Sequence, residues 1–440
     1  MRSAGEQHTI GCVMDRVVKH MHRLILVLSL AIASGASHAQ SLTPHAWLLS
    51  GTKIYLGPDV RPLDNGWILV EDGKIKAVGD ASATKPANIP VHRACSGGVV
   101  TAGFQNSHVH FTDPAFSDAG KRPAAEIERP LSRMLTRFGY TAVVDTGSNV
   151  FDTVALRQRI ASGDIKGPAI RTAGIPLYPN NGLPFYLRDL PPELLRMLPQ
   201  PATSEEALSH VRSNFERGAD ALKLFVATPQ GGGVIKRMSE EIARAAATEA
   251  HKRGGLVMAH PTDPEGAGAA VAAGVDILVH TTIDSPDLEW SDRLIEDMIV
   301  RHVSLVPTLK LWNYELGKSK VPEDVRANLV AGASRQLKRF LDAGGQVLFG
   351  TDVGYMAEVD PTEEYVLMAQ AGLTPLQILA SLTTAPAVRW KEATRHGRVQ
   401  AGFDADLVVL DGDPAADVKQ FANVRCAVRS GREIYIREKS

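Results

Sequence analysis

Between residues 100 and 398, short apolar runs alternate with longer stretches whose apolar residues recur at helical spacing. Eight runs have the length and composition of buried β-strands, and they lie at 99–111, 141–145, 169–176, 221–227, 256–260, 276–281, 304–311 and 346–352. Helical patterns lie between them, for example at 239–253, 291–302 and 335–343. Strand–helix units repeated over about 300 residues predict a (β/α)8 TIM barrel, which typically takes about 250 residues. An open, doubly wound sheet is the alternative.

The two ends of the chain have a different pattern, with short strands and frequent turn signals. Residues 40–100 contain Gly-Pro-Asp, Asp-Asn-Gly and Glu-Asp-Gly-Lys, and residues 399–440 contain Ala-Gly-Phe-Asp-Ala-Asp and Arg-Ser-Gly-Arg. Neither end has enough strands to form a stable sheet alone. We therefore predict one small β-sandwich built from both ends, beside a barrel formed by residues 101–398.

Two cysteines, Cys95 and Cys426, fall in these two ends. An exported protein can form a disulfide between such residues. The sequence does not give the distance between them, which decides whether the bond can form. Two buried thiols are the favoured prediction.

The first 39 residues have the pattern of a signal peptide rather than of a folded segment. A basic segment precedes an apolar run at 24–33, and small residues at Ser37 and Ala39 form a cleavage site. The run is shorter than the about 20 apolar residues of a transmembrane helix. We therefore expect a leader at 1–39 and a secreted, periplasmic protein that begins near Gln40.

Charge and composition exclude several kinds of partner. The 48 Lys plus Arg residues nearly balance the 49 Asp plus Glu residues, so the formal net charge is only −1. Without a basic patch, the chain lacks what proteins use to neutralise nucleic-acid phosphates. We expect no nucleic-acid or membrane partner. The oligomeric state is left open, a homo-oligomer included.

Residues able to bind metals stand where the predicted barrel strands end. The C-terminal ends of barrel strands meet at one face, where barrel enzymes have their active sites, and the spacing of these residues matches whole strand–helix units of about 35 residues. His108 and His110 face the same side because strand side chains alternate. The full set is His108 and His110 on the first strand, Lys223 on the fourth, and His260, His280 and Asp352 on the fifth, sixth and eighth.

Each of these residues also has a structural interpretation when taken alone. A histidine can be a hydrogen-bonded core residue, and Asp352 can cap the next helix. Lys223 lies in the apolar segment Ala-Leu-Lys-Leu-Phe-Val, where an unpaired ammonium group is costly. Either a buried carboxylate pairs with it, or it reacts with carbon dioxide to give a carbamate that can bridge two metal ions.

The whole set, with the closing stretch at 397–414, resembles the metal-dependent amidohydrolase superfamily over nearly all of the mature chain. Within it, the chain is most similar to the secreted imidazolonepropionase-like and prolidase-like branch. The resemblance implies two divalent ions, usually zinc. It places the more buried ion on His108, His110 and Asp352 and the second on His260 and His280, with a carboxylated Lys223 as the bridging ligand.

We therefore predict a metal-dependent hydrolase that cleaves an amide bond of a dipeptide or an N-acyl amino acid by attack of a metal-bridging hydroxide. Asp352 is the predicted general base and then general acid. A cyclic amide, a lactone or a phosphotriester is the alternative substrate. A non-catalytic scaffold would have lost ligands that are present here. Candidate substrate contacts, for which a structural or solvated role stays open, are Tyr178, Asn181, Arg188, Lys310 and Tyr355.

Overall fold

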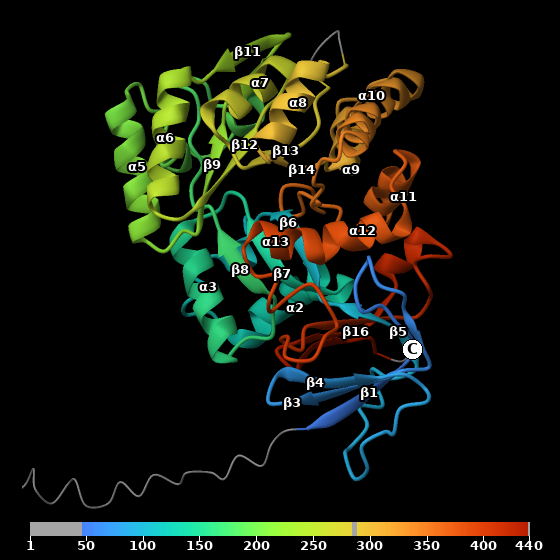
Figure 1. The fold of residues 1–440 in the computed structure, drawn as a ribbon. Coiled ribbons are helices and arrows are strands. Elements are labelled where there is room, and N and C mark those ends of the chain that lie inside the picture. The colour runs from blue at the N-terminus through green and yellow to red at the C-terminus, as the bar shows by residue number, and fades with distance from the viewer. Residues whose placement is uncertain (1–45, 284–287, 439–440) are drawn as a thin grey trace, which may run out of the picture. The chain divides into compact units, whose positions relative to one another are not determined.

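The structure, a computed structural model, describes residues 46–283 and 288–438. The predicted leader at 1–39 lies outside these residues. The described residues form a barrel of alternating strands and helices together with a β-rich part built from both ends, as Figure 1 shows. The predicted fold class is therefore confirmed.

The barrel wall consists of two parallel sheets with the strand orders β6–β7–β8 and β14–β13–β12–β9. Single β-bridges join the two sheets at both edges. Leu177, which follows β8, pairs with Leu224 of β9, and residues 347–353 connect the other edges because Val347 pairs with Leu305 of β14 and Val353 pairs with Val109 of β6. Residues 347–353 thus close the barrel without forming a regular strand. The strands are β6 (Phe104–Val109), β7 (Tyr140–Asp145), β8 (Ala169–Thr172), β9 (Ala221–Phe225), β12 (Leu256–His260), β13 (Ile277–Val279) and β14 (Ser304–Val306).

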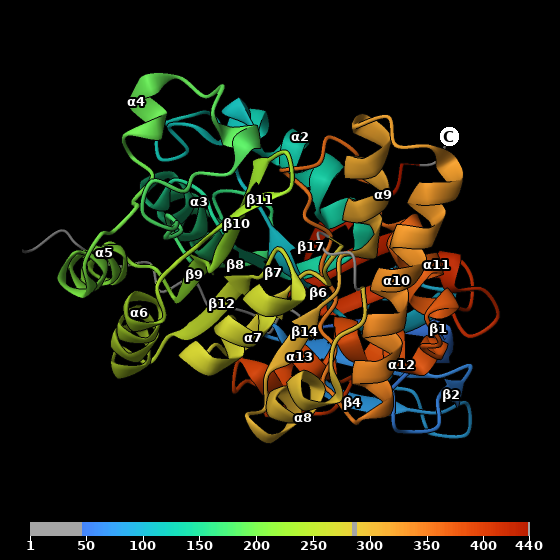
Figure 2. The same cartoon turned by 90° about the horizontal axis from the view of Figure 1, so that it is seen from above.

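Helices follow the barrel strands and surround them, which the view in Figure 2 makes clear. The predicted helical segments correspond to α6, α8 and the second half of α10. The longer helices are α2 (Ala124–Met134), α3 (Val150–Ser162), α5 (Ser204–Glu216), α6 (Glu240–Lys252), α7 (Pro264–Ala273), α8 (Asp292–Val300), α9 (Leu309–Lys318), α10 (Glu323–Asp342), α11 (Thr362–Gln370), α12 (Pro375–Leu382) and α13 (Thr384–Arg389). Short turns of helix are η1 (Pro114–Phe116), η2 (Thr136–Phe138), η3 (Phe185–Leu187), α4 (Pro192–Leu195) and η4 (Val418–Ala422). Within the described ranges, none of the helices combines the length and apolarity that a membrane span needs.

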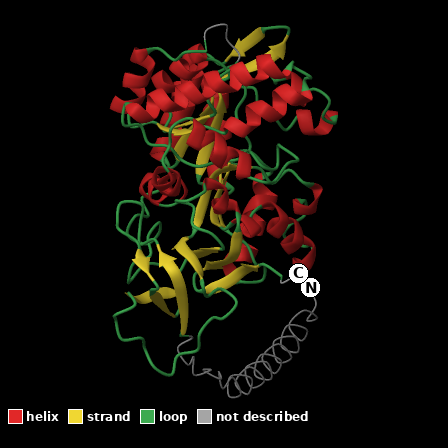
Figure 3. Cartoon of the chain, turned by 90° about the vertical axis from the view of Figure 1, so that its right-hand side faces the viewer, coloured by secondary structure: helices red, strands yellow, loops and turns green. Residues whose placement is uncertain are grey.

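Strands from both ends of the chain pair in the β-rich part, in the order β17–β16–β15–β5–β1–β3–β4, with β2 beside β1. Figure 3 shows these strands in yellow, apart from most of the helices. Residues 47–50 of β1 pair with β3, and residues 51–54 pair with β2 and β5. Side chains from the N-terminal strands and from the C-terminal strands pack together in one buried cluster. The strands are β1 (Trp47–Ile54), β2 (Leu63–Asp64), β3 (Trp67–Glu71), β4 (Lys74–Gly79), β5 (Gly98–Ala102), β15 (Leu407–Leu410), β16 (Val424–Arg429) and β17 (Arg432–Ile436).

The predicted first barrel strand at 99–111 is in fact two strands in two different sheets. β5 ends at Ala102 and β6 begins at Phe104, with Gly103 between them. A Cβ atom on Gly103 would lie 2.2 Å from Thr141 Oγ1, so only glycine fits where the chain passes from one sheet to the other. An unbroken apolar run conceals this change because both strands are buried.

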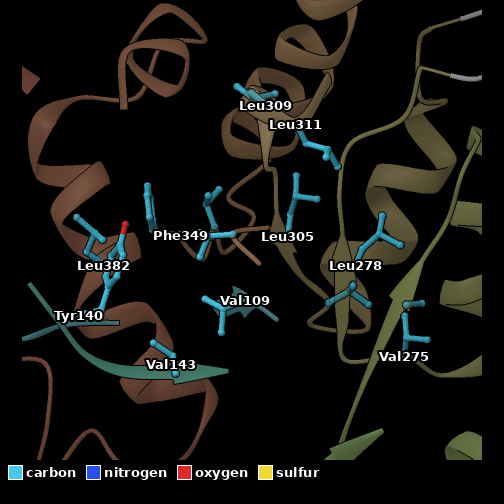
Figure 4. Close-up of a cluster of buried hydrophobic side chains, with 14 of the residues drawn as sticks. Val109, Tyr140, Val143, Val275, Leu278, Leu305, Leu309, Leu311, Phe349 and Leu382 are labelled. Atoms are coloured by element: carbon cyan, nitrogen blue, oxygen red, sulfur yellow. The ribbon is translucent and has the colours of Figure 1, made fainter. Parts of the chain in front are cut away.

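The strands bury side chains on both faces, as parallel barrel strands do. One cluster fills the barrel interior and comprises Val144, Met258, Ile277, Val279, Val306 and Leu348. A second, larger cluster lies between the strands and the helices, and Figure 4 shows its members Val109, Val143, Leu278, Leu305 and Phe349. The packed interior gives the polar residues at the strand ends a rigid floor.

A disulfide joins Cys95 and Cys426, whose Cα atoms lie 5.4 Å apart. The prediction of two buried thiols is therefore wrong. The antiparallel pairing of β15 with both β5 and β16 brings the two residues together across a sequence separation of 331. That pairing joins the two ends of the chain and cannot be read from either end alone.

We predict that the double variant Cys95→Ala/Cys426→Ala lowers the free energy of unfolding by about 2–4 kcal/mol, because the bond restricts the unfolded chain. Urea denaturation of the oxidised protein and of the variant measures the difference. Peptide mapping without reductant should recover the linked pair of peptides. Free thiols at both positions, with equal stability of the two proteins, would contradict the prediction.

Candidate metal centre

Three potential metal ligands converge tightly at the end of the barrel where β6 finishes. The Nε2 atoms of His108 and His110 lie 3.2 Å apart. Asp352 Oδ1 lies 3.1 Å from the first of these atoms and 3.0 Å from the second. His108 and Asp352 are buried and His110 is half-buried, so this group is largely shielded from solvent.

The other three sequence-predicted ligands surround this group. His280 Nε2 is 4.0 Å from Asp352 Oδ2, and the His280 ring lies 4.8 Å from the rings of both His108 and His260, measured between centroids. His260 stacks on Phe225, and Lys223 Nζ lies 5.4 Å from the centre of that same ring. The structure therefore gathers all six residues at one end of the barrel, three in a tight group and three next to it.

Left-handed backbone conformations occur at the strand ends that carry the ligands. His280 has φ +76° and Asp352 has φ +59°. Thr262 and Thr308, which follow β12 and β14, have φ +66° and +46°. Such conformations cost about 1–3 kcal/mol each in residues other than glycine and persist only where the surroundings impose them. These four residues are all buried, so packing at the strand ends imposes their conformations.

Hydrogen bonds from Nδ1 orient two of the imidazole rings. His110 Nδ1 donates to the carbonyl oxygen of Gly147 at 2.9 Å. His280 Nδ1 donates to Thr308 Oγ1 at 2.5 Å, since the Thr308 hydroxyl itself donates to Pro307 O. A proton on Nδ1 leaves the lone pair on Nε2, which is the form of histidine that binds a metal.

Asp145, at the end of β7, organises the turn that holds His110. Its carboxylate accepts hydrogen bonds from the hydroxyls of Ser148 and Thr172, both at 2.6 Å, and from Gly147 N–H at 3.2 Å. The sequence analysis missed this residue. An aspartate at the end of the predicted strand 141–145 was the available signal.

Burial controls the protonation of the histidines. It lowers the pKa of both His108 and His260 to about 3, and that of His280 well below its ordinary value. His110 differs: burial also lowers its pKa, but hydrogen bonding to Asp352 outweighs this effect and raises it. Three of the four rings are therefore neutral near pH 7, as a metal ligand must be.

The two other ionisable ligands are shifted toward states that suit a metal site. Burial opposes ionisation of Asp352, but the adjacent His108 and His110 hold its pKa well below the ordinary value. Burial lowers the pKa of Lys223 to about 7, against the opposing charge of Asp352. At neutral pH the site therefore holds a carboxylate and a lysine that readily loses its proton.

This donor set fits a divalent transition metal. In a tetrahedral site with bonds of about 2.0–2.1 Å, neighbouring ligand atoms lie about 3.3 Å apart, close to the 3.0–3.2 Å observed here. In the metal-binding form, in which both Nε2 atoms carry lone pairs, buried Asp352 Oδ1 is left without a hydrogen-bond donor among the described residues. A cation would satisfy all three atoms.

Aromatic side chains form part of the surroundings. Tyr178 is buried and stacks on Phe225 with 4.6 Å between ring centres. Tyr355 is half-buried, its ring centre lies 5.7 Å from that of Tyr186, and its hydroxyl donates to Glu315. Burial, and then the nearby Tyr178, Tyr355 and Asp352, raise the pKa of Tyr186 well above its ordinary value, so its hydroxyl stays neutral. Tyr178 thus packs on the ring that His260 also contacts, and Tyr355, predicted like Tyr178 as a substrate contact, packs against Tyr186.

The remaining candidate contacts lie in different settings. Asn181 is exposed and has a left-handed backbone, and exposed Arg188 donates to Gln230 at 2.7 Å. The strand predicted at 304–311 would place Lys310 near a barrel strand end, but this is wrong. β14 ends at Val306, and Lys310 lies in the first turn of α9. Its Nζ pairs with Glu358 at 3.2 Å and donates to a backbone carbonyl, so its charge is already compensated.

Comparison with known proteins gives consistent matches over most of the chain. A sequence model of the Amidohydrolase family matches residues 99–434. Ochratoxinase from Aspergillus niger is 26% identical over 421 residues, covering 84% of this chain and 83% of that protein. A crystal structure of the A. niger enzyme superimposes with a TM-score of 0.72 at 19% identity, covering 89% and 96% of the two chains.

A second solved structure has the same fold. It is a Xaa-Pro dipeptidase with methionine bound in its active site, with a TM-score of 0.73 and 21% identity. The match covers 88% of this chain and 99% of that one. At this level of identity the likeness concerns the fold.

We predict that Asp145→Asn weakens binding of Zn²⁺ by about tenfold or more, as loss of an outer-shell partner of a metal ligand typically does. An amide cannot accept from both hydroxyls and the Gly147 N–H as the carboxylate does. Calorimetric titration of metal-free protein measures the affinity. Asp404→Asn is the matched control, because that carboxylate is also buried but pairs with Lys74 and Arg395 in the β-rich part. Equal affinities in both variants would contradict the prediction.

Proposed function

We propose, since the chain belongs to the amidohydrolase family of hydrolases that act on carbon–nitrogen bonds, that it cleaves an amide bond in a dipeptide or an N-acyl amino acid. One observation carries the proposal: ligand atoms of His108, His110 and Asp352 converge at the strand ends, with His280 beside them. The match to ochratoxinase over 84% of the chain supports it.

Two divalent ions, which we propose to be zinc, fit the donor set of imidazoles and carboxylate. When bound, such ions lower the pKa of water to about 7 and polarise a carbonyl group. The residues that would hold them are His108, His110 and Asp352 for one, His260 and His280 for the other, and a carboxylated Lys223 between them.

Asp352 is the proposed proton carrier. Its Oδ1 faces the imidazoles of His108 and His110, and its Oδ2 faces His280. Its N–H donates to His108 O at 3.0 Å, which fixes the residue against β6. In the proposed reaction the carboxylate accepts a proton from the attacking water and delivers it to the amide nitrogen. The nitrogen then leaves as a neutral amine.

Lys223 is the proposed site of carboxylation. Its side chain is 1% exposed, and no carboxylate pairs with its Nζ in the described ranges. The alternative of a lysine paired with a buried carboxylate is thus not what the structure contains. In carboxylation, the lone pair of the neutral amine attacks the carbon of CO₂ and a proton passes to water. The product is an anionic carbamate.

Export is a second part of the proposal. The buried Cys95–Cys426 bond supports an oxidising compartment, because thiols in the cytosol are kept reduced. The leader at 1–39 would then be removed, and the mature protein would act on small amides or peptides outside the cytoplasm.

We predict that the zinc-loaded protein turns over members of a panel of dipeptides and N-acyl amino acids. Asp352→Asn should lower kcat by about 10²–10⁴, the usual contribution of a general acid–base group, while metal stays partly bound. Asp404→Asn, whose carboxylate pairs with Lys74 and Arg395 in the β-rich part, serves as the matched control. The panel includes cyclic amides, lactones and phosphotriesters, and turnover of these alone would contradict the proposal.

We predict a carbamate signal in ¹³C NMR after incubation of the protein with zinc and ¹³C-bicarbonate. Because the pKa of Lys223 is lowered to about 7, the neutral amine that reacts with CO₂ becomes more abundant as the pH rises from 6 to 8, and carboxylation should rise with it. Lys310→Ala, which removes another buried lysine, should retain the signal, and Lys223→Ala should lose it. A signal that survives in Lys223→Ala would refute the assignment.

A further inference from the structure

The helix α9 begins in an unusual way. Thr308 occupies its N-cap position, where a threonine side chain normally accepts a hydrogen bond from the first turn. Here Thr308 makes no such bond. Its hydroxyl instead donates to Pro307 O and accepts from His280 Nδ1. The free N–H groups of the first turn of α9 therefore need another acceptor.

Glu364 of α11 supplies that acceptor from a different part of the chain. Its Oε1 accepts from Leu309 N–H at 3.0 Å and its Oε2 from Lys310 N–H at 2.7 Å. Glu364 is fully buried, and the nearby Lys310 side chain pairs with Glu358 instead. A buried carboxylate without an ion-pair partner is costly. The positive end of the α9 dipole and two N–H donors offset part of that cost, and burial still raises the pKa of Glu364 to about 7.

Six other helices of the barrel are capped by their own N-cap side chains, whereas α2, α10, α11 and α13 have no side-chain cap. The six side chains that accept from the first turn are Asn149 in α3, Thr203 in α5, Ser239 in α6, Asp263 in α7, Ser291 in α8 and Thr374 in α12. In α9 the N-cap residue is present, but its hydroxyl is engaged with a histidine. The cap has been moved to Glu364.

We propose that Glu364 is a positioning residue for the metal ligand His280. By capping α9 it leaves the Thr308 hydroxyl free to hold His280 Nδ1, and this bond keeps the lone pair on Nε2. The inference rests on the metal centre of the proposed function. Glu364 would not contact the metal itself. Through Thr308 and His280 it would determine the affinity for the ion held by His260 and His280.

The link from Glu364 to His280 is stiff. Thr308 is β-branched and has a left-handed backbone, which the surrounding contacts must impose. The two bonds from Glu364 fix the two residues that directly follow Thr308. Trp312 Nε1 also donates to Thr281 Oγ1 at 2.9 Å, which ties α9 to the residue after His280. A shift of the first turn of α9 therefore reaches His280 directly.

Replacement of Glu364 by glutamine removes one of the two acceptors and turns an amide N–H₂ group toward an N–H donor. The Thr308 hydroxyl then competes for the uncapped first turn, and His280 Nδ1 loses its acceptor. We expect the affinity for one of the two ions to fall by about tenfold, the lower end of the range for outer-shell partners. The ion held by His108 and His110 should keep its affinity.

The test titrates Co²⁺ into the metal-free full-length protein and follows calorimetry and the visible spectrum. Glu364→Gln and Thr308→Val should each weaken one of two sites by about tenfold and change its spectrum. The double variant should be no weaker than either one, since both break the same link. Thr308→Ser keeps the hydroxyl and, unlike Thr308→Val, should bind both ions with the affinity of the unsubstituted protein. Thr374→Ala removes the cap of α12 and is the matched control, with no change expected.

Two results would overturn the inference. One is a Glu364→Gln protein that melts at a lower temperature but binds both ions with unchanged affinity and spectrum, which is what a purely structural cap would give. The other is a double variant whose loss of metal-binding free energy equals the sum of the losses in the two single variants. If the unsubstituted protein binds no divalent ion, the proposed function fails first, and the titration of that protein alone identifies this case.

Discussion

To bind a cation, the site must keep several hydrogen-bond acceptors buried together without protons between them. Asp352 Oδ1 and two Nε2 atoms lie within 3.0–3.2 Å of one another. Buried acceptors that face each other repel and have lost their water, so this arrangement is unfavourable until a cation joins it. The fold must hold these atoms in place against that cost, and much of the polar structure near the strand ends serves this purpose.

The restraint comes from groups that are themselves buried and bonded. Asp145 fixes the turn that holds His110, and Thr308 fixes His280. Left-handed backbone at His280 and Asp352 adds strain that only rigid surroundings can maintain. The packed cluster inside the barrel supplies that rigidity, because each strand end extends from a close-packed segment.

The sequence predicted the elements of this site better than the connections between them. Period-two alternation and strand ends predicted that the six residues would meet, because a barrel brings the C-terminal ends of its strands to one face. Asp145, Thr308 and Glu364 were not found, since their roles depend on bonds between elements distant in the chain. Lys310 was misplaced because the apolar run at 304–311 continues from β14 into α9 without a visible break. The disulfide required the register of β5, β15 and β16, and no local pattern encodes that register.

Charge balance explains why Lys223 matters more than its distance from the tight group suggests. In the proposed function, two divalent ions would bring four positive charges to a site in which the ligating imidazoles would be neutral and Asp352 would supply one negative charge. An ammonium group at Lys223 would add a fifth positive charge in a region of low dielectric, where repulsion is strong. A carbamate would instead supply a second negative charge at the same position. The neutral amine that burial favours is the form from which that anion can be made, so under the proposed function this one buried lysine would decide between one ion and two.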